Sequence, residues 1–319
     1  MIKRTLYFGN PAYLNLSDAQ LKVRLPEVEK NDTLPDQFKK EAVASIPIED
    51  IGIVILDHKQ ITITQGVLEA LLNNNVALIT CNSTHHPIGL TLPLSSNTVQ
   101  NERYRAQLDA SEPLKKQLWA QTVEQKISNQ KQVLQYHDLP FDYLKPIIKN
   151  IKSGDSGNAE GIAAAYYWKT LSPVLFINKV ANNKSIFKRD REGLAPNNYL
   201  NYAYAILRAT MARSIVGAGL LPTLGIFHRN RYNAYCLADD LMEPYRPIID
   251  MIVIELVKNH GLNEDIPVDI KKIILQIPAM DVIINGEKSP LMIATQRTSV
   301  SLVKCLEGEQ RKLLYPELV

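Results

Sequence analysis

The stretch PIGLTLPLSSNTVQNERYRAQLDA, residues 87–110, is where the character of this chain changes. Its first eight residues are typical of a strand, the polar segment SSNTV follows, and a helical pattern begins at Gln100. A chain of 319 residues is also longer than one hydrophobic core usually serves. We therefore expect two domains, residues 1–95 and 96–319.

Upstream of this stretch the sequence predicts a β-rich domain. The strand candidates are RTLYFGN (4–10), AYLNLSD (12–18), QLKVRLP (20–26), two strands within IGIVILDHKQITIT (51–64), and VALITC (76–81). One helix, at about 65–72, interrupts them and ends at the Asn triplet 73–75. So few helices can cover little of the sheet, so the strands are expected to form a small sandwich or a compact barrel-like sheet.

Downstream of it the sequence predicts an all-helical domain, which makes the fold class α+β. Helices are expected from Ser111 to about Tyr136, at 141–151, after Asp155 or Ser156, and from Pro196 to the Gly217 and Gly219 pair. The helical pattern from Leu237 to His260 contains Pro244 and Pro247, so the helix must kink or begin there.

The composition is that of a globular protein, with 45% apolar and 22% charged residues. The longest apolar runs, such as IGIVIL (51–56) and MIVIELV (251–257), are far shorter than the roughly 20 residues that a membrane-spanning helix needs. The amino terminus has no secretory pattern. We expect a cytoplasmic protein with no membrane partner.

Charge is distributed unevenly along the helical domain. Residues 178–231 contain nine Lys or Arg and two acids, whereas residues 239–250 contain four acids and one base. A basic surface beside an acidic cluster suits a metal-dependent enzyme that acts on nucleic acid, because cations hold phosphates while carboxylates hold the metal. Solvated helix faces are the alternative interpretation.

The acidic cluster lies in HRNRYNAYCLADDLMEPYR, residues 228–246. Asp240 and Glu243 are three residues apart and share a helix face, toward which a loop could turn His228. Carboxylate oxygens and one imidazole suit Mg²⁺ or Mn²⁺. The candidate third anchor is Glu160, a carboxylate in the small, apolar helix GNAEGIAAAYYW, although an acid in a first turn also suits the helix dipole.

Three motifs then occur in a specific order: NAEGIAAAYYW (158–168), PNNYLNYAYAILRA (196–209) and GIFHRNRYNAYCLADDLMEPYRPIID (225–250). Together they resemble the CRISPR-associated integrase that acquires new spacers, and most of all its type II branch. The resemblance implies a divalent-metal site made by Glu160, His228 and Glu243, with Asp240 as an auxiliary ligand and Asp239 left on the surface.

The same resemblance implies an activity and partners. The enzyme would join a DNA 3′-hydroxyl to a phosphodiester of the CRISPR repeat, with Mg²⁺ or Mn²⁺ as cofactor, and water in place of the hydroxyl would give endonuclease activity. Relatives form homodimers through the amino-terminal domain and bind a small second adaptation subunit. Two alternatives stay open: a metal-dependent nuclease that only cleaves DNA, and a DNA-binding scaffold whose acidic cluster is structural.

Several supporting residues have two interpretations each. Phosphate contacts or surface ion pairs are the choices for a basic group: Lys188, Arg189, Arg191, Arg229 and Arg231. Arg246 could orient Glu243 or pair with Asp250. The aromatic run 166–168 could stack on bases but is more typical of a core. His85 and His86 have no acid near them in sequence and are assigned to a polar turn.

Overall fold

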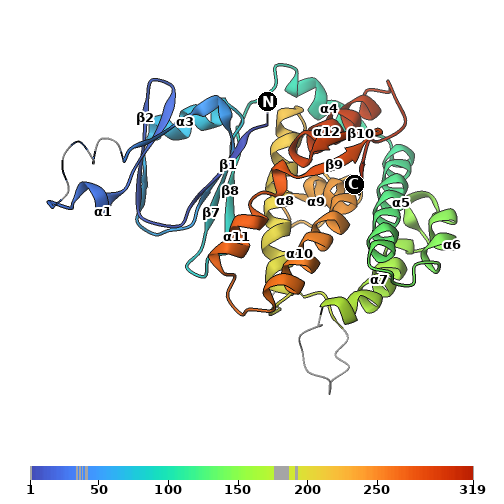
Figure 1. Cartoon of the computed structure of the whole chain (residues 1–319). Coiled ribbons are helices and arrows are strands. Elements are labelled where there is room, and N and C mark those ends of the chain that lie inside the picture. The colour runs from blue at the N-terminus through green and yellow to red at the C-terminus, as the bar shows by residue number, and fades with distance from the viewer. Residues whose placement is uncertain are drawn as a thin grey trace. The chain divides into compact units, whose positions relative to one another are not determined.

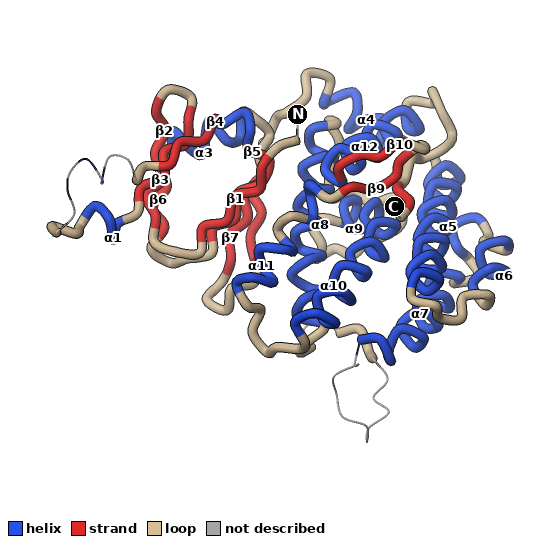
Figure 2. The backbone as a smooth tube through the Cα atoms, viewed as in Figure 1, coloured by secondary structure: helices blue, strands red, loops and turns tan. Residues whose placement is uncertain are grey.

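The computed structural model describes residues 2–33, 35, 37, 39, 42–175, 187–190 and 193–318. It divides into two compact units, Met1–Thr98 and Val99–Val319. Strands predominate in the first unit and helices in the second (Figure 2). The sequence had placed this boundary between residues 95 and 96.

The amino-terminal unit is built from two four-stranded sheets. One has the order β1-β5-β7-β8 and the other β4-β3-β2-β6. The strands are β1 (Arg4–Phe8), β2 (Ala12–Ser17), β3 (Gln20–Arg24), β4 (Ala44–Pro47), β5 (Ile51–Leu56), β6 (Ile61–Ile63), β7 (Ala77–Cys81) and β8 (Pro87–Thr91). The helical segments between them are α1 (Pro26–Glu29), η1 (Ile48–Asp50) and α3 (Gln65–Asn73).

Both sheets contribute to one buried core, as in a sandwich. Leu14 and Leu21 come from the second sheet, Val54 from the first, and Leu71 from α3. The sequence missed β4 and the parallel pairing of β5 with β1 and β7. Parallel pairing joins segments far apart in sequence, and its only local trace is a strand apolar on both faces, as IGIVIL is.

His85 lies in the predicted turn, but in three dimensions it has an acid beside it that is distant in sequence. Its Nδ1 lies 2.9 Å from Oδ1 of Asp57, and the Tyr7 hydroxyl donates to the other carboxylate oxygen at 2.5 Å. Asp57 is buried at the end of β5, so it needs these partners. Sheet pairing, which brings β7 beside β5, is what places the β7–β8 turn next to this acid.

The carboxy-terminal unit is mostly helical (Figure 1). Its helices are α4 (Gln100–Asp109), α5 (Glu112–Tyr136), α6 (Leu144–Lys149), α7 (Ala159–Leu175), α8 (Asn197–Gly217), α9 (Cys236–Met242), α10 (Arg246–His260), α11 (Val268–Ile274) and α12 (Leu291–Leu306). The unit also contains the 3₁₀ helices η2 (Ser153–Asp155), η3 (Glu243–Tyr245) and η4 (Ile277–Ala279) and the short strand β11 (Pro316–Glu317).

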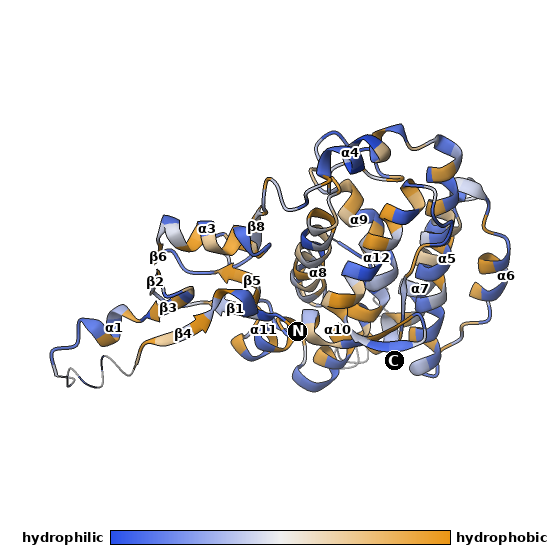
Figure 3. Cartoon of the chain, turned by 90° about the horizontal axis from the view of Figure 1, so that it is seen from above, coloured by the Kyte–Doolittle hydropathy of each residue, from blue (hydrophilic) through white to orange (hydrophobic). Residues whose placement is uncertain are grey.

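Two helices organise this unit. Nearly every residue of α8 is buried, and it packs against α9, α10 and α12. The long helix α5 packs against α6, α7 and α10. By contrast, α4 is almost wholly hydrophilic (Figure 3), and it is fastened by Gln107, whose amide donates to the carbonyls of Leu221 and Leu224.

Two helix signals in the sequence are confirmed. The Ser111 hydroxyl accepts a hydrogen bond from the Leu114 amide at the start of α5. The expected interruption at the two prolines also occurs, because α9 ends at Met242, Pro244 lies in η3, and Pro247 lies in the first turn of α10.

The expectation of an all-helical second domain needs one correction. β9 (Asp281–Ile284) and β10 (Glu287–Pro290) form a hairpin, and β11 pairs with β9. The turn residues Asn285 and Gly286 have φ of 54° and 75°, as an Asn-Gly hairpin turn requires. The two-part α+β fold is confirmed, with a small sheet added to its helical part. No described helix is long and apolar enough to cross a membrane.

Candidate active site

Glu160 lies in the first turn of α7, and the preceding turn fixes its position. Both carboxylate oxygens of Asp155 accept backbone hydrogen bonds, from the Ala159 amide at 2.7 Å and the Glu160 amide at 3.0 Å. The predicted cap at Asp155 or Ser156 is therefore Asp155. This cap satisfies amides that a helix end would leave unpaired, and the helix that it begins packs against α5 and α10.

Glu243 lies where the proline-interrupted helix changes direction. Its side chain is only 6% exposed, and its Oε1 lies 3.0 Å from Nε of Arg246. Of the two interpretations of Arg246, the structure supports the one in which it orients Glu243. Its guanidinium also lies 4.9 Å from the centre of the Tyr204 ring, which fixes it from the other side.

The two glutamates converge on a residue that the sequence did not suggest. Nζ of Lys126, on α5, lies 2.6 Å from Oε1 of Glu160 and 2.6 Å from Oε2 of Glu243. The signal was present, since Lys126 lies on the buried face of α5 with Val123, Ile127 and Gln130, at helical spacing. A lysine on such a face must have a charged partner, which only the fold could identify.

The charges of this cluster support one another. Burial opposes ionisation of Glu243, but Arg246 and Lys126 outweigh it and lower the pKa of the carboxyl. Burial also opposes the charge on Lys126, yet Glu243 and then Glu160 raise the pKa of its ammonium. The Glu243 carboxylate and the Lys126 ammonium are therefore both charged at neutral pH.

His228 is held by Asp240. Its Nδ1 lies 2.5 Å from Oδ1 of Asp240, whose other oxygen accepts the Phe227 amide at 2.9 Å. The Phe227 ring stacks on Trp119 with centroids 4.2 Å apart, and this fixes the loop against α5. A methyl group on Gly225 would meet the His228 carbonyl at 2.4 Å and the Asp240 carboxylate at 2.7 Å, so this close approach requires glycine.

Asp240 thus lies differently from the auxiliary ligand that was expected. It is completely buried and directed at His228. Its oxygens accept hydrogen bonds from the imidazole and from the backbone amides of Phe227 and His228. This hydrogen bond raises the pKa of His228, against the effect of partial burial. Glu243 and Glu160 contribute to the same rise, so they lie within electrostatic range of the imidazole.

The sequence predicts Asp239 on the surface, and the structure contradicts this prediction. Asp239 is 8% exposed, and Arg208 of α8 grips it through Nε at 2.6 Å and a terminal nitrogen at 3.0 Å. The amide of Asn233 donates to it as well, at 2.7 Å. Helix α9 packs directly on α8, so this acid faces a neighbouring helix and anchors the loop that follows His228.

Asp250 forms a buried network behind Arg246. Its carboxylate accepts hydrogen bonds from the hydroxyls of Tyr167, at 3.0 Å, and Tyr204. Burial raises the pKa of Asp250 to about 6, against the opposing effect of the two hydroxyls. Tyr167 is buried, so the interpretation of this tyrosine as core is confirmed.

The predicted DNA-contacting residues have different surroundings. Arg189 is half-buried and donates to Asn197 at 3.0 Å and to Asn201 at 2.6 Å, so the fold already uses its guanidinium. Arg229 is exposed and pairs with Glu112 at 2.7 Å. Arg231 and Lys188 are exposed, while Arg191 lies outside the described residues.

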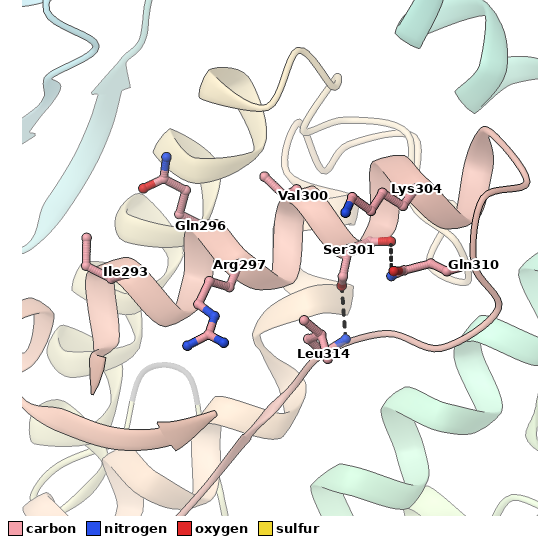
Figure 4. Close-up of a pocket in the computed structure, with 8 residues that line it drawn as sticks. All are labelled: Ile293, Gln296, Arg297, Val300, Ser301, Lys304, Gln310 and Leu314. Atoms are coloured by element: carbon pink, nitrogen blue, oxygen red, sulfur yellow. Dashed lines mark hydrogen bonds between the residues drawn. The ribbon is translucent and has the colours of Figure 1, made fainter. Parts of the chain in front are cut away.

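A hollow of about 330 Å³ opens beside His228. Lys115, Arg229 and Arg231 line it, which makes its wall basic. Another hollow, of about 290 Å³, lies on α12 between Ile293 and Leu314 (Figure 4). No carboxylate or histidine is among the described residues that line the second hollow, whereas His228 lines the first.

The carboxylates fit a divalent cation. Oε2 of Glu243 is buried and has no partner in hydrogen-bond geometry within the described structure, so the nearby ammonium meets it as a point charge. Two carboxylates on one cation are the hard oxygen donors that Mg²⁺ and Mn²⁺ take. In the arrangement that the structure describes, no three His, Cys, Asp or Glu side chains of the described residues are grouped to hold an ion.

Comparison with known proteins shows that the chain matches one protein family over most of its length. The model of the family "CRISPR associated protein Cas1" matches residues 8–285. A CRISPR-associated endonuclease Cas1 from Neisseria meningitidis serogroup C is 39% identical over 230 residues, which are 72% of this chain and 72% of that protein.

Two solved structures share the fold. A casposase bound to integration product has a TM-score of 0.76 at 22% identity, covering 98% of this chain and 92% of that chain. A chain of a Cas6-RT-Cas1–Cas2 complex has a TM-score of 0.71 at 18% identity, covering 98% of this chain and 36% of that chain.

Proposed function

Because this chain belongs to the family of CRISPR-associated Cas1 proteins, we propose that it is a divalent-metal-dependent DNA integrase that inserts new spacers into a CRISPR array. In the proposed reaction, a DNA 3′-hydroxyl attacks a phosphodiester of the repeat and releases a new 3′-hydroxyl. Water in place of that hydroxyl would give endonuclease activity. The observation that carries the proposal is the convergence of Glu160 and Glu243, from separate helices, on one cation.

Glu160, Glu243 and His228 would hold Mg²⁺ or Mn²⁺. When bound, the ion would lower the pKa of the attacking hydroxyl and neutralise the charge that grows on the phosphate. Asp240 accepts from Nδ1 of His228 and so leaves Nε2 available as the ligand atom. Arg246 holds Oε1 of Glu243, which leaves Oε2 directed at the shared cation position.

Exposed cations near His228 are the best candidates for phosphate contacts. Arg229 and Arg231 line the hollow beside the imidazole, and the ion pair of Arg229 with Glu112 is exposed and therefore easily exchanged for a phosphate. Lys188 is exposed too. Arg189 is left out of this set because asparagine side chains already bind its guanidinium.

The partners follow from the relatives. One similar structure is described as a complex that contains Cas1 and Cas2, and we propose that this chain binds DNA and a Cas2-like small subunit in the cytoplasm. We also propose a homodimer formed through the amino-terminal unit. Mass measurement of the purified protein, with and without the small subunit, tests both assemblies.

A strand-transfer assay tests the activity. Purified protein would be incubated with Mn²⁺ or Mg²⁺, a duplex with free 3′-hydroxyl ends and a repeat-containing target. We expect joined products from the unmodified protein and from Glu255→Gln, a matched control whose carboxylate lies on the surface of α10. Glu243→Gln should give none. Cleavage without joining would indicate a nuclease only, and DNA binding without either reaction would indicate a scaffold.

A further inference from the structure

Lys126 is a buried cation in the middle of a long helix. Its side chain is 11% exposed, and it lies on α5 among residues that pack against α7 and α10. An isolated ammonium in such a place is strongly unfavourable, so its two carboxylate partners are what keep it there.

The two cations beside Glu243 contact different carboxylate oxygens. Arg246 lies on Oε1 of Glu243, whereas Lys126 lies on Oε2 of Glu243 and on Oε1 of Glu160. Lys126 alone therefore bridges the oxygens that face each other. A divalent ion that bound both of these oxygens would have to take the place of the ammonium, because two cations at the same position would repel each other strongly.

A small cavity adjoins the Lys126 side chain. Its volume is about 50 Å³, and its wall includes Lys126, Gln130, Tyr204 and Asp250 together with two further cations, Arg189 and Arg246. That volume is enough for a group the size of a water molecule. The carboxylate of Asp250 in its wall would attract a displaced ammonium, whereas Arg189 and Arg246 would repel it.

We propose that Lys126 is a tethered cation, which holds Glu160 and Glu243 together in the metal-free protein and gives up its position when Mg²⁺ or Mn²⁺ binds. The inference rests on the proposed function, since it assumes that these glutamates are metal ligands. Its consequence is that the metal affinity reflects a competition with the lysine. Without Lys126, two like charges remain side by side and attract the divalent ion more strongly.

Calorimetric titration with MnCl₂, together with melting temperatures measured with and without Mn²⁺, tests this role. We expect Lys126→Met to bind Mn²⁺ about ten- to a hundredfold more tightly than the unmodified protein. Its metal-free melting temperature should fall, and Mn²⁺ should raise it more than in the unmodified protein. Lys131→Met, on the same helix but with no ion pair described, should match the unmodified protein in both measurements.

The outcomes separate this inference from the proposed function. Equal or weaker Mn²⁺ binding by folded Lys126→Met would refute the tethered-cation role and leave the metal site intact. If that variant folds only with Mn²⁺, the role is supported. If it does not fold at all, Lys126→Gln decides by the same affinity criterion. No Mn²⁺ binding by the unmodified protein, or binding that survives Glu243→Gln, would refute the metal site itself.

Discussion

Asp250→Asn should change the pH dependence of stability in a way that the structure allows to be worked out. Burial raises the pKa of Asp250 from 3.8 to about 6, so its carboxyl is easier to keep protonated in the folded protein than in the unfolded chain. The corresponding stability is fully present below pH 3.8 and is lost as the pH rises through about 6. A shift of this size is worth about 3 kcal/mol in total, of which about 2 kcal/mol is lost between about pH 4.5 and pH 8.

Asparagine cannot ionise, so the variant lacks this loss. It should carry a separate cost of about 1–3 kcal/mol at every pH, because its side chain offers one oxygen to two tyrosine hydroxyls. The difference in unfolding free energy between the unmodified protein and Asp250→Asn should therefore shrink by about 2 kcal/mol from about pH 4.5 to pH 8.

Urea unfolding in chelator-containing buffer, followed by tryptophan fluorescence, gives this difference. Both tryptophans, Trp119 and Trp168, lie in the carboxy-terminal unit, so the signal reports the unit that contains Asp250. The control is Asp142→Asn, since Asp142 is 82% exposed and should show no such trend. A difference that stays constant within about 0.5 kcal/mol over this pH range would refute the argument from burial.

Three further predictions concern the site. Glu243→Gln should abolish strand transfer while Glu255→Gln retains it, and joining by the first variant in a gel assay would contradict the metal-site assignment. Asp240→Asn should lower the pKa of His228 toward its ordinary value, because the hydrogen bond that raises it is lost; an unchanged imidazole titration by NMR would count against this. The stability that the ionised His228–Asp240 pair contributes is present below pH 6.5, as long as Asp240 keeps its charge, and is lost as the pH rises through the raised folded pKa of His228. The thermal destabilisation of this variant should therefore be largest in mild acid, since burial raises the pKa of Asp240 as well. Gly225→Ala should destabilise the protein by about 1–3 kcal/mol, since its methyl group would meet the His228 carbonyl, and an unaltered chemical unfolding curve would show that the loop yields freely.

Local signals in the sequence predicted the elements of this fold well. The serine before α5, the prolines between α9 and α10, and the change of pattern after residue 94 each act within a few residues of where they stand. The Asn-Gly hairpin at residues 285 and 286 was equally local and could have been found. Parallel pairing in the first unit could not, because it depends on segments far apart in the chain.

The candidate site likewise combines residues that the sequence predicted with contacts that it could not predict. The order of three motifs indicated a family resemblance, and that resemblance selected Glu160, His228 and Glu243 as candidate ligands. The sequence could not show that Asp240 turns to His228, that Asp239 is gripped by Arg208, or that Lys126 bridges the two glutamates. Those contacts join side chains from different helices, and only tertiary packing decides which buried charge meets which partner.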